Sequence, residues 1–166
     1  MSKVIVSCYR QAETAFKEHH PAYVVSILGA DEGPSLSFDG LSSENIIELR
    51  GDCSSTDENT TRCQELVDLG RSWDKKAPVL IHCHQGVARS MAAAYIILCA
   101  AQDGVCEHQI ADGLRKAAPH ADPNILLISE ADKLMGREDR MVEAILDLPP
   151  CAGAKCDNVV ILPVDA

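Results

Sequence analysis

A cysteine and an arginine are separated by five residues in the middle of the chain, and a serine follows the arginine: Cys83, Arg89 and Ser90. As a thiolate, a cysteine is a strong nucleophile. The planar guanidinium of an arginine can hold two oxygens of a tetrahedral oxyanion at once. A neighbouring hydroxyl can donate a hydrogen bond to the sulfur and help it leave afterwards. These residue types at this spacing are suited to nucleophilic chemistry on a phosphate-like group.

The segment around these residues predicts a strand, a tight loop and a helix. The apolar run 79–81 is typical of a strand buried on both faces, and it leads to Cys83. Gly86 lets the backbone turn tightly, and from about Ala88 the sequence is apolar on every side, as in a helix inside a domain. Unpaired N–H groups in the loop 84–88 and the first helical turn would bind an anion. The same field would keep Cys83 ionised at neutral pH.

The string His82-Cys83-x5-Arg89-Ser90, with Gly86 inside it, resembles the signature of cysteine-dependent protein tyrosine and dual-specificity phosphatases. The resemblance covers roughly residues 45–147. It implies hydrolysis of phosphomonoesters through a phosphocysteine intermediate, with no metal and no cofactor. Cys83 would be the nucleophile, Arg89 would hold the phosphate, and His82 would order the loop. The remaining phosphate-binding N–H groups would belong to His84, Gln85, Gly86, Val87 and Ala88.

The resemblance also implies an aspartic acid that protonates the leaving oxygen, on a loop after a strand and about thirty residues before the cysteine. Asp52 lies 31 residues before Cys83 and follows the predicted strand 46–50. Asp57 is the alternative, although an N-cap role among the surrounding Ser and Thr residues would explain it. We expect Asp52 to be the general acid and keep Asp57 open.

The sequence leaves two other functions open. A sulfur transferase of the rhodanese type also places a cysteine on an anion-binding loop, but its loop is typically shorter and needs no upstream acid. A phosphate-binding module without turnover would keep the loop and lose the chemistry. For the substrate, a phosphorylated protein or a small phosphomonoester is favoured over a phosphoinositide, because the loop contains no lysine to hold additional phosphates.

The elements around this segment predict a single α/β domain. Its central, mostly parallel sheet would have four or five strands flanked by helices, with four helices after the signature strand. Ligands in such folds bind at the carboxyl ends of the strands, where Cys83 and Asp52 could meet. Ser55 and Glu58 form a capping-box pattern at the start of one helix, and 122–123, Asp-Pro, would open another. The other strands are predicted at 3–8, 22–28 and 46–50.

We expect the phosphatase-like domain to span residues 1–150 and a C-terminal tail to span 151–166. Within the tail, the apolar run 159–162 could add an edge strand, which Pro163 would permit, or pack against a neighbouring subunit. Both alternatives stay open, as does the oligomeric state.

Charge and hydropathy exclude two classes of partner. The chain has 166 residues and a formal net charge of −10, which argues against a nucleic-acid partner. No apolar run approaches the length of a membrane span, and the N-terminal apolar stretch is too short for a signal peptide. We therefore expect a cytoplasmic protein without a membrane partner.

The eight cysteines are scattered through predicted strands and helices, which favours reduced thiols over a disulfide scaffold. Neighbouring side chains at a strand end point to alternating sides, so 82–84, His-Cys-His, cannot share one zinc ion. Cys151 and Cys156 lack the second ligand pair of a zinc site. Cys53 and Cys8 are candidates to trap an oxidised Cys83 as a disulfide.

Overall fold

The computed structural model describes residues 2–153 and 159–164, and Cys156 lies outside them. In chain order the elements are β1 (Lys3–Cys8), the 3-10 turn η1 (Tyr9–Gln11), α1 (Ala12–His19), β2 (Tyr23–Leu28), η2 (Ser43–Asn45), β3 (Ile46–Arg50), α2 (Thr56–Ser72), β4 (Val79–Cys83), α3 (Arg89–Ala101), α4 (Glu107–Ala117), α5 (Ile125–Met135), α6 (Arg140–Leu146) and β5 (Val160–Pro163). None of the helices in the described ranges is long and apolar enough to cross a membrane.

The five strands form one sheet in the order β3-β2-β4-β1-β5. β1 to β4 run parallel to their neighbours, whereas β5 pairs antiparallel with β1 at the edge. β4 therefore lies in the middle, between β1 and β2, and Cys83 is the register partner of Cys8. The prediction of a single α/β domain with a mostly parallel sheet is confirmed.

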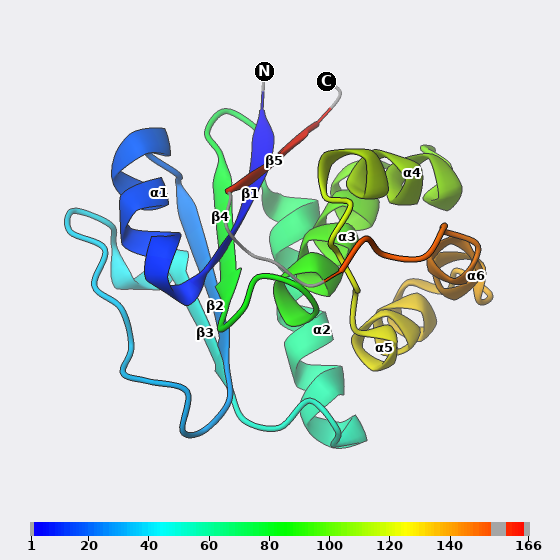
Figure 1. Ribbon diagram of the computed structural model, residues 1–166, viewed down its shortest axis with the longest axis horizontal. Coiled ribbons are helices and arrows are strands. Elements are labelled where there is room, and N and C mark those ends of the chain that lie inside the picture. The colour runs from blue at the N-terminus through cyan, green and yellow to red at the C-terminus, as the bar shows by residue number, and fades with distance from the viewer. Residues whose placement is uncertain (1, 154–158, 165–166) are drawn as a thin grey trace.

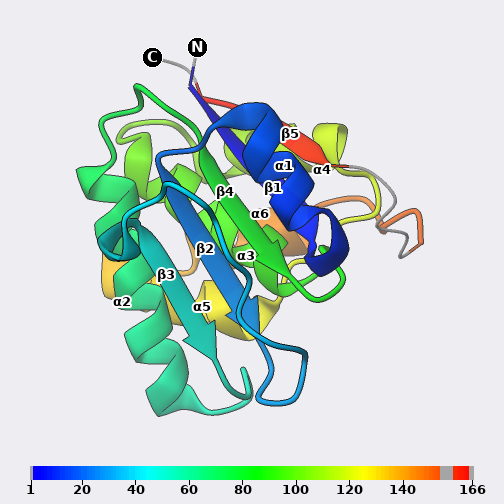
Figure 2. The ribbon, with the colours of Figure 1, turned by 90° about the vertical axis from the view of Figure 1, so that its left-hand side faces the viewer.

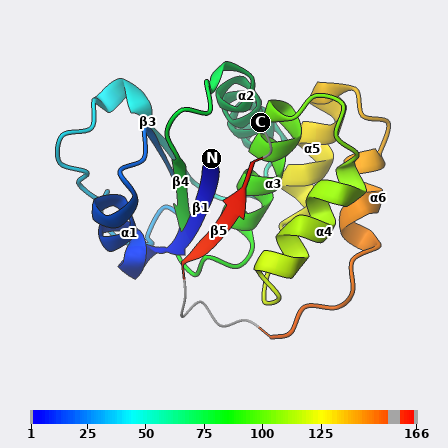
Figure 3. The same ribbon diagram turned by 90° about the horizontal axis from the view of Figure 1, so that it is seen from above.

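Helices cover both faces of the sheet (Figure 1). α1 lies alone on one face, where Ala12 and Ala15 pack in a cluster with Ile5, Val24 and Leu80; Figure 2 looks onto this face. The helices α2 to α6 lie on the other side, as the view from above in Figure 3 shows. Because side chains alternate along a strand, each inner strand supplies apolar residues to both helical layers.

α3 is the centre of the larger layer, and its residues from Ser90 to Ala100 are buried. Its apolar sequence on all sides explains why it lies between β4 and the other helices rather than at the surface. Gly70 of α2 allows a close approach, because a Cβ at this position would lie 2.7 Å from the Cβ of Ala100 and 2.8 Å from the carbonyl oxygen of Ile97. The contact between α2 and α3 therefore requires a glycine.

Two helix starts differ from the sequence-based expectation. Ser55 is the N-cap of α2, but its side chain makes no capping hydrogen bond. Glu58, its expected partner, instead accepts a hydrogen bond from Arg62 at 3.0 Å. α5 begins after Asn124, whose side chain accepts two backbone N–H bonds, rather than directly at 122–123. A side-chain cap thus determines this helix start.

Candidate functional site

The predicted nucleophile lies at the carboxyl end of the central strand. Cys83 ends β4, and only 2% of its surface is exposed. Its Sγ lies 3.1 Å from the backbone nitrogen of Gly86 and 3.1 Å from Oγ of Ser90. Gly86 has a φ of 72°, which turns the loop back over the sulfur before α3 begins at Arg89. The sulfur therefore lies within a turn of N–H groups at a helix N-terminus, where an ionised thiol would accept both bonds.

Neighbouring elements hold the loop 84–88 by its carbonyl groups. Three of these carbonyls accept hydrogen bonds from backbone N–H groups elsewhere: His84 from Tyr9 at 3.2 Å, Val87 from Asp122 at 3.0 Å and Ala88 from Asn124 at 3.1 Å. In a planar trans peptide the next N–H points opposite to the carbonyl, so these bonds turn the N–H groups of Gln85, Ala88 and Arg89 the other way. The carbonyl groups of these three peptides thus face neighbouring elements and their N–H groups face away from them, an orientation that would suit an anion cradle.

Glu32 binds the guanidinium of Arg89 through both carboxylate oxygens. Oε2 lies 2.6 Å from Nη1 and Oε1 lies 2.8 Å from Nη2. Sequence reasoning missed this residue, since it lies in the loop after β2, 57 positions before Arg89. An acidic residue at the carboxyl end of a neighbouring parallel strand was the one available signal.

The same carboxylate is fixed from its own loop. Oε2 of Glu32 also accepts the backbone N–H of Gly29 at 2.6 Å. The hydrogen bond from Arg89 is the main reason why the pKa of Glu32 falls from 4.5 to about 2, with the Gly29 N–H acting in the same direction and burial opposing both. The pair uses one N–H of each terminal nitrogen of Arg89, and a guanidinium has five. Among the described residues, no hydrogen bond engages Nε–H or the Nη–H beside it, so these two donors could form a second fork for an oxyanion.

The predicted acid, Asp52, lies in the loop after β3, and Arg62 holds the backbone of this loop. The guanidinium of Arg62 is buried and donates to the carbonyl oxygens of Arg50 at 3.2 Å and Asp52 at 3.0 Å. The exposed carboxylate of Asp52 accepts from the backbone N–H and the hydroxyl of Ser54, and these bonds lower its pKa. Among the described residues, no hydrogen bond or ion pair joins this carboxylate to Arg89.

Asp57 lies elsewhere, in the first turn of α2, and its side chain is exposed. An acidic residue there is stabilised by the helix dipole, so its position is explained without a role in the site.

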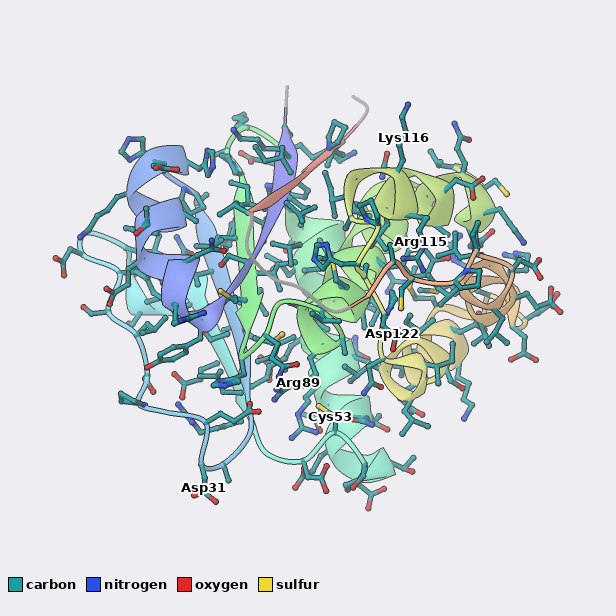
Figure 4. All side chains as sticks on the ribbon, in the orientation of Figure 1. Asp31, Cys53, Arg89, Arg115, Lys116 and Asp122 are labelled. Carbon is teal, nitrogen blue, oxygen red and sulfur yellow. The ribbon has the colours of Figure 1, made fainter. Side chains whose placement is uncertain are left out.

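The two cysteines considered as redox partners lie on different sides of Cys83. Cys8 is its register neighbour on β1, and its Sγ donates to Oε1 of Gln11 at 3.6 Å. Cys53 is half-buried on the loop beside Asp52 and is near enough for the charge of Arg89 to act on it (Figure 4). Burial raises the pKa of Cys53 against that charge. Each cysteine of the described residues is a free thiol.

His82 lies directly before the nucleophile and is completely buried. Burial lowers its pKa to about 4, so the ring is neutral near pH 7. The rings of Tyr9 and Phe38 lie next to it, with centroid distances of 6.1 Å and 6.3 Å. Within residues 2–153 and 159–164, no group of three or more His, Cys, Asp or Glu side chains could hold a metal ion.

Comparisons with known proteins identify the fold. No family model matches the sequence, and no curated protein matches it either. Among solved structures, the chain is similar to PTP-2 phosphatase of Cydia pomonella, with a TM-score of 0.60, 17% identity and coverage of 78% of this chain and 84% of that chain. Human DUSP28 has a TM-score of 0.56, 15% identity and coverage of 82% and 90%. The Yvh1 phosphatase domain of Chaetomium thermophilum has a TM-score of 0.52, 16% identity and coverage of 83% and 93%. The chain therefore has the fold of the dual-specificity phosphatases.

Proposed function

We propose that this chain is a cysteine-dependent phosphomonoester hydrolase, of the protein tyrosine and dual-specificity type. The observation that carries the proposal is the environment of Cys83. Its sulfur lies 3.1 Å from both an N–H group of the loop and the hydroxyl of Ser90, directly before the helix that begins with Arg89. A thiol used only for packing would have no need of these donors.

In the first step, the Cys83 thiolate attacks phosphorus in line with the leaving oxygen. The S–P bond forms as the P–O bond breaks, and the free fork of Arg89 and the inward N–H groups of the loop hold the three equatorial oxygens. These donors are in place before the substrate arrives, so they stabilise the charge of the transition state without reorganisation. Glu32 would keep this fork oriented by binding the adjacent edge of the guanidinium, at Nη1 and Nη2.

Asp52 is proposed to give its proton to the leaving oxygen. In the second step it takes a proton from water as the water attacks phosphorus, while the hydroxyl of Ser90 stabilises the departing sulfur. For the first step the carboxylate must exchange Ser54 for the leaving oxygen and become protonated. Loss of the two Ser54 bonds, which lower the pKa of Asp52, favours that protonation.

The substrate is proposed to be a phosphorylated protein or a small phosphomonoester. The loop offers backbone donors and one arginine for a single phosphate, without a lysine for a second one. We also propose a cytoplasmic location, and a phosphatase-like domain 1–150 followed by a tail 151–166 whose strand β5 adds to the edge of the sheet.

Steady-state hydrolysis of p-nitrophenyl phosphate tests the function, with Cys83→Ser as the matched variant. We expect turnover in the wild-type protein and none in the variant. Turnover in Cys83→Ser would refute the nucleophile, whereas vanadate binding by a wild-type protein without turnover would identify a phosphate-binding module. Formation of thiocyanate from thiosulfate and cyanide would instead indicate a sulfur transferase. A panel of phosphotyrosyl, phosphoseryl and small phosphomonoesters then defines the substrate.

A further inference from the structure

Three side chains lie next to one another in the sheet, at the level of the residue before Cys83. The loop 84–88 that follows is called the phosphate loop below. Ser7 on β1, His82 on β4 and Ser26 on β2 are register partners, and partners on neighbouring parallel strands point to the same face. All three are buried, with exposed fractions of 0%, 0% and 3%. Oγ of Ser26 lies 2.6 Å from Nε2 of His82, whereas the Ser7 hydroxyl has no hydrogen-bond partner among the described residues. Only one of the two flanking serines thus binds the ring.

The proton positions on His82 follow from its two contacts. Nδ1 faces the carbonyl oxygen of Cys83 at 3.5 Å, and a carbonyl oxygen can only accept. The favoured arrangement therefore has the proton on Nδ1. The buried ring is neutral and carries a single proton, so Nε2 is an acceptor and the Ser26 hydroxyl must be the donor.

We propose that Ser26 is a positioning residue for the phosphate loop. Its hydroxyl holds His82 in the tautomer whose Nδ1–H faces the Cys83 carbonyl, and this fixes the first peptide of the loop. The proposal deepens the proposed function and rests on it, because the fixed peptide orders the donors around the nucleophile.

The aromatic neighbours of the ring cannot replace this hydrogen bond. Tyr9 and Phe38 limit where the ring can lie, but aromatic contacts of this kind do not distinguish Nδ1 from Nε2. The contact with the Cys83 carbonyl is long, so the short bond from Ser26 is the stronger restraint on ring rotation. Without it, the ring can turn and the first loop peptide loses its partner.

The experiment compares Ser26→Ala with Ser7→Ala, the same substitution at the same level of the sheet on the other side of His82. Nitrogen-15 NMR of the histidine rings reports the tautomer directly, with His82→Gln used to assign the signals, and kcat/KM reports the effect on turnover. Ser26→Thr keeps the hydroxyl and serves as the rescue variant. If Ser26→Ala does not fold, Ser26→Cys, whose S–H is a weak donor, takes its place.

We expect Nδ1 of His82 to carry the proton in the wild-type protein. In Ser26→Ala the Nε2 signal should move towards that of a nitrogen without a hydrogen bond, and kcat/KM should fall about tenfold, which corresponds to about 1.4 kcal/mol. Ser7→Ala should resemble the wild type, and Ser26→Thr should restore both readouts. A proton on Nε2 in the wild type, or equal behaviour of Ser26→Ala and Ser7→Ala, would overturn the proposal. A wild type without hydrolysis would refute the proposed function, while the ring signals would still decide whether Ser26 holds His82.

Discussion

Replacing Glu32 by glutamine tests the contact that sequence reasoning missed. Glutamine keeps the size of the side chain but removes the negative charge and one acceptor oxygen. The ion pair with Arg89 is partly shielded from water, with side-chain exposures of 19% for Arg89 and 32% for Glu32. The Glu32→Gln variant should therefore lose more stability than an ordinary surface substitution.

The size of the effect follows from the pKa of Glu32, which drops from 4.5 to about 2, chiefly through the hydrogen bond from Arg89. A pKa difference of one corresponds to about 1.4 kcal/mol. The lowered pKa therefore corresponds to a contribution of about 3 kcal/mol to the free energy of unfolding, before screening by solvent is considered. Because about a third of the side chain is exposed, solvent screening reduces this to about 1–2 kcal/mol.

The lowered pKa of Glu32 determines how its contribution to stability changes with pH. A carboxylate with a lowered folded-state pKa stabilises the fold above its unfolded pKa of 4.5, and this contribution is lost as the pH falls towards 2. Urea unfolding should show Glu32→Gln to be less stable than the wild type at pH 7, with a smaller difference at pH 3. Asp31→Asn, an exposed neighbour in the same loop, is the control. An equal loss at both pH values, or the same loss in the control, would refute the reasoning.

Four further variants have expected outcomes. Asp52→Asn should lower kcat on a phosphotyrosyl peptide about 100-fold, and much less on an ester with a good leaving group, because only the poor leaving group needs the proton. Asp57→Asn should behave like the wild type, and the reverse order would assign the acid to Asp57. Arg89→Lys should lower kcat for p-nitrophenyl phosphate about 100-fold, since the charge remains but the paired bonds are lost; near-normal turnover would contradict the role of the fork. Gly70→Ala should lower the free energy of unfolding in urea by about 1–3 kcal/mol, because its Cβ would lie 2.7 Å from that of Ala100; an unchanged value would show that α2 can move away.

The parts of the structure that depend on local sequence were predictable. The apolar run before Cys83 and the apolar helix after it lie within 23 residues of sequence, 79–101, so their pattern alone predicted β4 and α3. The alternation of strands and helices likewise predicted the mostly parallel sheet. These features follow from periodicity and burial, which act over short distances along the chain.

The contacts that support the loop depend on which strands become neighbours. Glu32 meets Arg89, and Ser26 meets His82, only because β2 lies beside β4 in the sheet. Arg62 likewise reaches the carbonyl oxygens of Arg50 and Asp52 only because α2 packs beside the end of β3. No residue spacing specifies these distances, so the sequence predicted candidate reacting groups but not the Glu32, Ser26 and Arg62 side chains that contact the elements around them.

The strand order has a consequence for local opening of the molecule. β4, which ends at the proposed nucleophile, has hydrogen-bonded strands on both sides, whereas β3, which leads to the candidate acid, lies at an edge of the sheet. Amide protons of β4 should therefore exchange with solvent only on global unfolding, while those of the segment after β3 should exchange through small local fluctuations. We therefore expect the Cys83 sulfur to be held on a slowly exchanging strand, and the Asp52 carboxylate to follow a segment that opens more readily.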